Sequence, residues 1–210
     1  MEVSAMLKSD GFNLWANAYD KSVNLSEEAN EYPFAGYKDV LGTIYQIIKK
    51  GNGNKILDIG FGTGILSKKL YDDGCDIYGI DFSEKMIEIA KSKMPNAALI
   101  QYDFTKGLPD SIINETFDFI ICTYAIHHLD HPQQVAFIQK LLQLLTKNGA
   151  VLIGDVAFQT QNELEKCKKE SGNLWDQDEV YPIIDQFKAD FPNMEYQQIS
   201  ICSGVLIFKQ

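Results

Sequence analysis

Three glycines at alternate positions form the most informative cluster of the chain, in the segment Asp58-Ile-Gly60-Phe61-Gly62-Thr-Gly64. The cluster follows the apolar run 55–59 and precedes the helical pattern 65–70, so it is predicted to join a buried strand to a helix. Glycine accepts a positive φ and leaves backbone N–H groups bare, so the turn and the helix start can bind the polar end of a ligand. Asp58 can accept a hydrogen bond from an ammonium group or hold the loop. The segment predicts a cofactor-binding turn; the alternative is a tight turn that binds nothing.

A second acidic group, Asp81, ends the next apolar run, roughly 20 positions beyond the first glycine. A carboxylate at the end of the neighbouring strand can accept hydrogen bonds from both hydroxyls of a ribose. Phe82 is expected to contact the same ligand, and Ser83 is suited to cap the next helix. The helix cap and the ribose contact can coexist, so this segment predicts a cofactor that carries a nucleoside.

The near-continuous apolar run 117–122 predicts a buried parallel strand, and it ends in Thr123-Tyr124-Ala-Ile-His127-His128. Ligands of open α/β sheets bind at the carboxyl ends of the strands, so Thr123 is expected to face the cofactor. His127 or His128 can act as a general base, because a neutral imidazole accepts a proton near pH 7. The alternative is a packed histidine that shapes the pocket. Tyr124 and Asp155, also at strand ends, are candidates for the same wall.

His127, His128, Asp130 and His131 together also suggest a metal site. Ligands spaced so tightly point in different directions, however, and the sequence fixes no cysteine or second acidic group beside them. We therefore expect no metal.

The order of elements favours an α/β fold with helices on both faces of a largely parallel sheet. Strands are expected at 55–59, 76–80, 97–101, 117–122 and 150–155, preceded by a helix at 37–50 and followed by a hairpin of 195–202 and 204–209. The helix 133–145 is expected to end at Lys147-Asn-Gly149. We expect a single domain, with a helical cap or lid at 1–50, a cofactor-binding core at 51–155, and a lid connection and hairpin at 156–210.

The composition limits the classes of partner that the protein is expected to bind. The 210 residues carry a net charge of -10, and all 19 basic residues are lysines. A nucleic-acid substrate is disfavoured because phosphates are bound mainly through positive charge. No apolar stretch approaches the length that spans a membrane, so no membrane partner and a cytoplasmic location are expected. A monomer or a homodimer fits a chain of this kind.

Four segments resemble class I methyltransferases that depend on S-adenosylmethionine (SAM). They are Trp15-Ala-Asn-Ala-Tyr19-Asp20, Leu57-Asp-Ile-Gly-Phe-Gly-Thr-Gly64, Gly79-Ile-Asp-Phe-Ser83 and Thr123-Tyr-Ala-Ile-His-His-Leu129. The resemblance implies a Rossmann-like fold with seven strands in the order 3-2-1-4-5-7-6 and an antiparallel C-terminal hairpin. It also implies that SAM is the cofactor and S-adenosylhomocysteine (SAH) the product.

The same resemblance assigns further residues to the cofactor. Asp103 would read the amino group of adenine, and the backbone N–H of Phe104 would read the ring. Tyr19 would lie over the cofactor in a closed state and contribute to catalysis. Asp103 as a turn residue, and Trp15 with Tyr19 as anchors of an amphipathic helix, are the alternatives.

The implied reaction is in-line methyl transfer to an unidentified small molecule. Because the sulfonium already activates the methyl group, the enzyme mainly has to align the acceptor and exclude water. Two other classes stay open at this stage: a protein that binds SAM without catalysis, and an NAD(P)-dependent oxidoreductase, which uses a similar first strand and ribose-binding acid.

Overall fold

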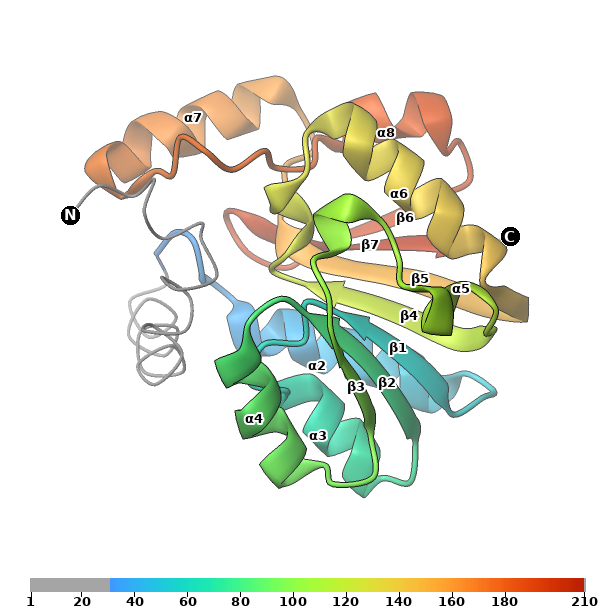
Figure 1. The fold of residues 1–210 in the computed structure, drawn as a ribbon. Coiled ribbons are helices and arrows are strands. Elements are labelled where there is room, and N and C mark those ends of the chain that lie inside the picture. Colours follow the sequence, from blue (N-terminus) through green and yellow to red (C-terminus); the bar gives the residue numbers. More distant parts are fainter. Residues whose placement is uncertain (1–30, 210) are drawn as a thin grey trace.

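The computed structural model describes residues 31–209. Within them, a seven-stranded sheet has the order β3-β2-β1-β4-β5-β7-β6 (Figure 1), which confirms the expected topology. Neighbouring strands from β3 to β5 run parallel, and β7 runs antiparallel to both β5 and β6. The strands are β1 (Lys55–Ile59), β2 (Asp76–Asp81), β3 (Ala98–Gln101), β4 (Phe117–Thr123), β5 (Leu145–Val156), β6 (Glu195–Gln198) and β7 (Ser203–Lys209).

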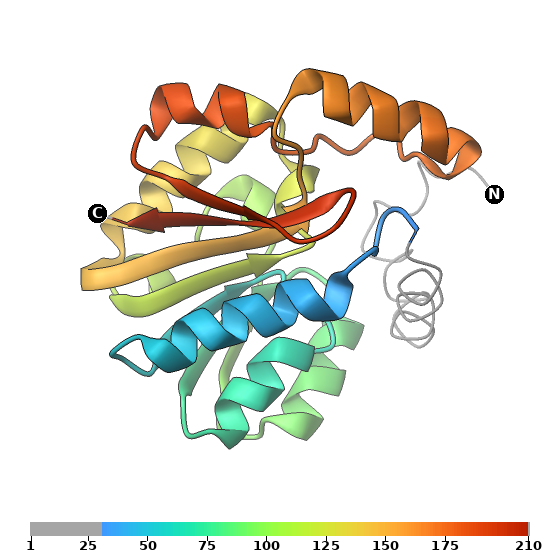
Figure 2. The same ribbon diagram turned by 180° about the vertical axis from the view of Figure 1, so that it is seen from behind.

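Helices cover both faces of the sheet, as Figures 1 and 2 show from opposite sides. They are α2 (Tyr37–Lys50), α3 (Ile65–Asp72), α4 (Glu84–Lys93), α5 (Asp110–Ile113), α6 (His131–Gln143), α7 (Gln161–Ser171) and α8 (Ile184–Asp190). Three short 3-10 turns join them: η2 (Phe104–Lys106), η3 (Ile126–His128) and η4 (Gly172–Leu174). Helix α2 matches its expected bounds and lies across the sheet in Figure 2.

The core lies in two layers, one on each face of the sheet. Alternate residues of a strand point to opposite faces, so Ile56 of β1 belongs to the layer under α2, α3 and α4, whereas Leu57 and Ile59 belong to the layer under α6 and α8. Because both faces are covered, the central strands are apolar throughout, and their carboxyl ends are held at one edge of the sheet. That edge carries the predicted site residues.

The expected end of the helix before β5 was wrong. Helix α6 ends at Gln143, and the residues expected to stop it, Lys147 to Gly149, lie inside β5. Leu145 already pairs with Phe117, and regular pairing resumes only at Ala150, because an irregularity interrupts the ladder. Asp118 holds this irregular stretch by accepting a hydrogen bond from the Thr146 hydroxyl at 3.0 Å.

The long connection between β5 and β6 carries helices α7 and α8, as its length predicted. Between them, the chain returns to the sheet: Val180 N donates to His127 O at 2.9 Å, and Phe158 N donates to Pro182 O at 3.0 Å. This return brings residues 176–181 to the end of β4. Across residues 31–209, none of the helices combines the length and the apolarity needed to cross a bilayer.

Candidate active site

The glycine turn has the backbone that the sequence required. Gly60, Gly62 and Gly64 adopt φ values of 67°, 55° and 75°, a region that side chains rarely enter. A Cβ on Gly60 would lie 2.8 Å from the Cβ of Ala125, whereas a Cβ on Gly62 would meet nothing within 4 Å. Gly60 is therefore required by packing against the end of β4, and Gly62 leaves its backbone open to the adjoining cleft.

The cleft lies over the carboxyl ends of β1, β2 and β4 and has a volume of about 700 Å³, including space open to solvent. Eight of the predicted cofactor residues line it: Asp58, Gly60, Phe61, Gly62, Asp81, Phe82, Phe104 and Thr123. The structure thus brings together residues from four separate segments of the chain.

Three predicted residues do not line this cleft. Gly64 begins helix α3 behind the turn. Asp103 caps η2, where its carboxylate accepts hydrogen bonds from Thr105 N at 3.1 Å and pairs with Lys106 at 3.0 Å. This is the turn role given above as the alternative for Asp103. Contact between Asp103 and adenine stays a prediction. Tyr19 lies outside the described residues.

Asp58 is buried and has one unsatisfied oxygen. Its Oδ2 accepts a hydrogen bond from the Ser67 hydroxyl, and no partner for Oδ1 is found among the described residues. Burial raises the pKa of Asp58 to about 7, although the Ser67 hydrogen bond opposes the shift. A buried carboxylate oxygen without a donor is costly, so this oxygen suits the ammonium group of a ligand.

Asp81, at the end of β2, is hydrogen-bonded to the glycine turn that follows β1. Its Oδ2 accepts from Gly62 N at 2.9 Å, and its Oδ1 accepts from Ser83 N at 2.8 Å. Burial raises the pKa of Asp81 to about 6 despite these bonds. Each carboxylate oxygen can accept a second hydrogen bond, so Asp81 can fix the glycine turn and bind two hydroxyls together. Ser83 caps α4, as its position predicted.

Aromatic side chains form the far side of the cleft, and the sequence did not predict that they group together. Tyr124 is buried with a φ of 50°, which is unusual for a bulky residue and common at functional sites. Its ring packs against Tyr37 at 5.1 Å and Phe34 at 5.4 Å, between centroids. Only the apolar helical period of residues 37–50 pointed to α2, and it gave no sign that Tyr37 and Leu41 line the cleft.

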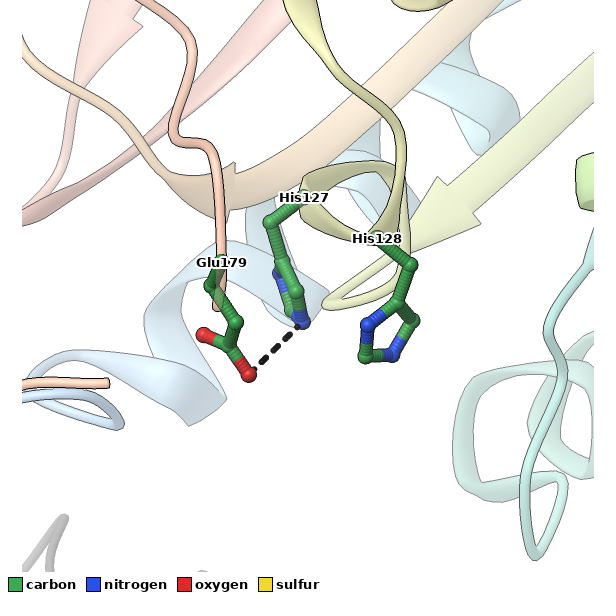
Figure 3. Close-up of side chains that lie close together, drawn as sticks. All are labelled: His127, His128 and Glu179. Atoms are coloured by element: carbon green, nitrogen blue, oxygen red, sulfur yellow. Dashed lines mark ion pairs between the residues drawn. The ribbon is translucent and has the colours of Figure 1, made fainter. Parts of the chain in front are cut away.

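Beside this wall, His127 lies between two carboxylates. Its Nδ1 is 2.7 Å from Asp155 Oδ1, and its Nε2 is 3.3 Å from Glu179 Oε1 (Figure 3). Burial would lower the pKa of His127, but the two carboxylates outweigh it and raise the pKa to about 9. Both ring nitrogens are engaged, so His127 in this arrangement is a proton-holding bridge rather than an available base.

His128 differs from its neighbour. It lines the cleft, and burial together with nearby His127 lowers its pKa to about 3, so its imidazole is neutral near pH 7. A general base works best with a pKa near the working pH, so a pKa of about 3 makes His128 a weak base, and a general-base role for either histidine stays a prediction. The sequence placed no second acidic group here, but the structure brings in Glu179 from the β5–β6 connection and Asp155 from β5.

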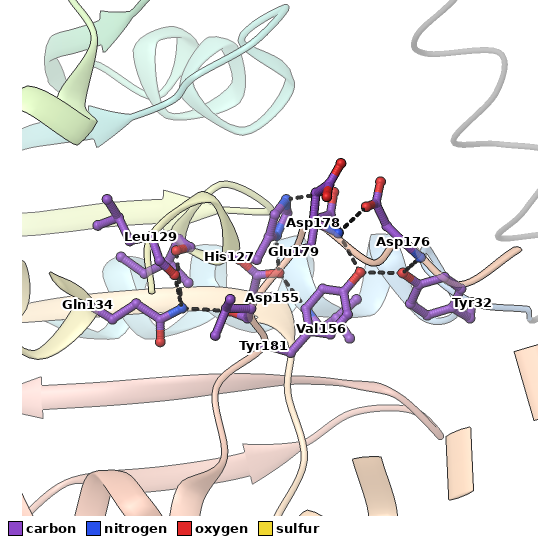
Figure 4. A network of polar contacts seen from close by, with 12 residues as sticks. Tyr32, His127, Leu129, Gln134, Asp155, Val156, Asp176, Asp178, Glu179 and Tyr181 are labelled. Atoms are coloured by element: carbon purple, nitrogen blue, oxygen red, sulfur yellow. Dashed lines mark hydrogen bonds and ion pairs between the residues drawn. The ribbon is translucent and has the colours of Figure 1, made fainter. Parts of the chain in front are cut away.

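Hydrogen bonds join this cluster to distant parts of the chain (Figure 4). The Tyr181 hydroxyl donates to Glu179, and the Tyr32 hydroxyl lies within hydrogen-bonding distance of the Tyr181 hydroxyl. The buried side chain of Gln134 donates to Leu129 O at 2.9 Å and to Val180 O at 2.6 Å. No local motif predicts the contacts of Tyr32 with Tyr181 or of Gln134 with Val180, because these partners are 149 and 46 positions apart in sequence.

Comparisons with known proteins agree with this geometry. Residues 56–149 match the family described as "Methyltransferase domain". An uncharacterized methyltransferase of Anoxybacillus flavithermus is 33% identical over 187 residues, which cover 89% of this chain and 85% of that protein. A second, from Alkaliphilus oremlandii, is 32% identical and covers 86% of this chain and 80% of that protein.

Solved structures show the same fold at lower identity. Magnesium protoporphyrin IX methyltransferase from Synechocystis PCC 6803, crystallised with SAH, is similar with a TM-score of 0.65 and 20% identity, covering 84% of this chain and 85% of that one. The DhpI–SAM–HEP complex gives a TM-score of 0.66 at 16% identity and covers both chains fully. Together, the relatives, the strand order and the glycine turn place this chain in the family of class I SAM-dependent methyltransferases.

Proposed function

We propose that this methyltransferase acts on a small molecule that enters the cleft beside His128 and the aromatic wall. The observation that carries the proposal is the lining of the cleft, which combines apolar side chains with two aspartates and a histidine and contains no lysine among the described residues. With a net charge of -10 and no arginine, the chain offers little to a polyanionic acceptor.

The proposed cofactor contacts follow from the unsatisfied groups. The Asp58 oxygen that lacks a partner would accept from the SAM ammonium, and the glycine turn with the start of α3 would receive its carboxylate. Asp81 would bind the ribose hydroxyls, and Phe104 and Asp103 would contact adenine. Thr123 would lie beneath the methyl donor. Tyr19 as a lid over the cofactor remains part of the proposal.

The mechanism needs little acid–base chemistry. SAM, when bound, supplies a methyl group on a positively charged sulfur that is ready for displacement. The residues of the cleft then hold the acceptor in line with that methyl group and keep water out. Tyr37 and Tyr124 provide the apolar wall, and His128 lines the cleft beside them. His127 packs against His128, with 4.4 Å between the ring centroids, and so helps to orient it.

Methyl transfer to a metabolite is the test. The purified protein is incubated with SAM and a fractionated extract of small molecules, and mass spectrometry follows both SAH release and any product heavier by one methyl group. A small methylated product supports the proposal. SAH release only with a macromolecular fraction, or SAM binding without turnover, contradicts it. A thermal-shift control should show stabilisation by SAM and SAH but not by NADH or NADPH.

The ribose contact has its own test. Asp81→Ala should weaken SAM binding by about 1–3 kcal/mol, because ribose hydroxyls are left unpaired in a buried site. Calorimetry with SAH measures the affinity, and the melting temperature of the free variant shows whether loss of the Gly62 and Ser83 hydrogen bonds also affects folding. Unchanged SAH affinity would place the ribose elsewhere.

A further inference from the structure

Three groups that bind metals converge beside the cofactor cleft. His127 and His128 project from η3, and Glu179 projects from the β5–β6 connection toward them (Figure 3). One ligand atom from each lies within 4.8 Å of the others. Helix α6, strand β5 and helix α7 separate Glu179 from the histidines in the sequence, so only the folded chain assembles this set.

Two of these groups are already oriented by outer hydrogen bonds. Asp155 Oδ1 lies 2.7 Å from His127 Nδ1, which leaves Nε2 directed at Glu179. The Tyr181 hydroxyl donates to Glu179 Oε2, which leaves Oε1 directed at His127 (Figure 4). Metal-binding histidines nearly always donate their other N–H to a carboxylate or carbonyl, and metal-binding carboxylates are held in the same way.

The spacing fits a small divalent cation. Two ligands that each bind zinc at about 2.0–2.2 Å in tetrahedral geometry lie roughly 3.3 Å apart, and His127 Nε2 lies 3.3 Å from Glu179 Oε1. Two histidines and one glutamate are a known set for catalytic zinc, whose fourth position stays open. Charge favours a cation as well, because fully buried Asp155 has a second oxygen, Oδ2, without a partner among the described residues.

We propose that His127 Nε2, His128 and Glu179 bind a divalent transition metal of the zinc class at the acceptor end of the cleft. The expectation of no metal depended on the tight spacing of the ligands and on the lack of a nearby acidic group, and Glu179 removes the second argument. The two-carboxylate bridge around His127 is the metal-free alternative, in which a proton takes the position of the cation.

The role of this metal rests on the proposed function. Since His128 lines the cleft, an open position of the metal would face the methyl donor. An acceptor hydroxyl or thiol that binds there loses its proton to solvent more readily. Its lone pair then forms the bond to the methyl carbon while the methyl–sulfur bond breaks and leaves neutral SAH. Methyl transfer thus releases one proton and consumes the positive charge of the sulfonium.

The test measures metal binding directly. Protein stripped with a chelator is titrated with Co²⁺, read by its visible absorption bands, and then with Zn²⁺ in competition. We expect one ion per chain, held by nitrogen and oxygen ligands. Absorption typical of a cobalt–thiolate bond would place the ion at one of the four cysteines and overturn the proposal, as would the absence of saturable binding.

Matched variants locate the ion. His128→Ala and Glu179→Gln should each weaken Zn²⁺ binding by more than the roughly 10- to 100-fold that changes in outer hydrogen bonds cause. His131→Ala and Asp178→Asn are the controls, because His131 packs against Phe187 and Asp178 is exposed. Equal affinity in a ligand variant and its control overturns the site. Circular dichroism shows whether each variant is folded. If His128→Ala does not fold, Glu179→Gln still tests the site.

SAH binding separates this proposal from the proposed function. Glu179→Gln should keep wild-type SAH affinity, because Glu179 is not among the described residues that line the cleft. Metal binding without methyl transfer to any small molecule would leave the site standing and refute the function. Small-molecule methyl transfer that is unaffected by chelation and by both ligand variants would refute the catalytic role of the metal.

Discussion

The two ends of the cleft are built in different ways. At the cofactor end, the contacts connect residues close in sequence: Ser67 to Asp58 spans nine residues, and Gly62 to Asp81 spans 19. At the acceptor end, His127 and Asp155 are 28 residues apart, and Tyr32 and Tyr181 are 149 apart. The first end consists of bare backbone and two buried carboxylates, whereas the second is a network of side chains from four segments.

This difference shows how one fold can serve many acceptors. A local turn between consecutive strands reproduces the same cofactor bed wherever its few residues occur. The acceptor end depends on where a long connection returns to the sheet, so it can change without disturbing the cofactor. Cofactor and acceptor functions should therefore be separable by mutation.

The largest effect is expected at Gly60. Gly60→Ala places a Cβ 2.8 Å from the Cβ of Ala125 on a backbone with φ 67°, so it should cost about 2–5 kcal/mol of folding free energy and abolish SAM binding. Gly74→Ala is the control, since Gly74 also has a positive φ but open space around it. Urea denaturation and calorimetry with SAH measure both quantities. Equal losses in the two variants would mean that strain alone, and not the contact with β4, explains Gly60.

Asp58→Asn should separate cofactor binding from folding. The substitution removes a buried charge with an unpaired oxygen, so the free protein should be as stable as wild type or more stable at pH 8. SAM affinity should fall by about 1.5–3 kcal/mol, the value of a hydrogen bond to a charged group. Asp76→Asn is the control, because Asp76 is exposed and lies at the opposite end of β2 from Asp81. Unchanged affinity in Asp58→Asn would assign Asp58 to the loop and not to the ligand.

Gln134→Leu tests the acceptor end of the cleft. The substitution removes hydrogen bonds to Leu129 O and Val180 O, so the 3-10 turn of the histidines loses its tie to the connection. We expect a loss of about 1–3 kcal/mol in folding free energy, because buried carbonyls are left unsatisfied. Methyl transfer should fall while SAH affinity stays at the wild-type value. A matching fall in SAH affinity would show that the two ends are coupled.

The smallest effect is a dependence on pH. The pKa of Asp58 is raised to about 7 in the folded state, so the folded state binds a proton that the unfolded state releases. This contribution stabilises the protein below pH 7 and is lost as the pH rises through 7, by about 1 kcal/mol between pH 6 and pH 8. SAM affinity should change in the opposite direction, because the ionised carboxylate accepts from the ammonium group. Denaturation and calorimetry at both pH values check the sign, and Asp58→Asn is the reference that lacks this contribution while Asp81 and His127 still titrate.

Much of the fold followed from local patterns. Helix α2 matched its expected bounds, and the parallel strands were located to within a residue at most ends, because their apolar runs are bounded by glycine and polar residues. The exception was the start of β5. There the glycine and asparagine of a typical helix stop lie in a strand irregularity, because Leu145 pairs with Phe117 before them. Tertiary pairing overrode the turn signal.

The sequence by itself determined the strands and the glycine turn of the cofactor end, since a turn between an apolar strand and a helix depends on backbone conformation and on neighbours a few positions away. The strand order was implied by the resemblance to class I methyltransferases. Only the tertiary structure decided the acceptor end. Glu179 and Tyr181 reach His127 through the path of a long connection, and the chain carries no local signal of where such a connection returns. The engagement of His127 by two carboxylates, and the convergence of His128 with Glu179, depend on contacts between segments that meet only in the folded protein.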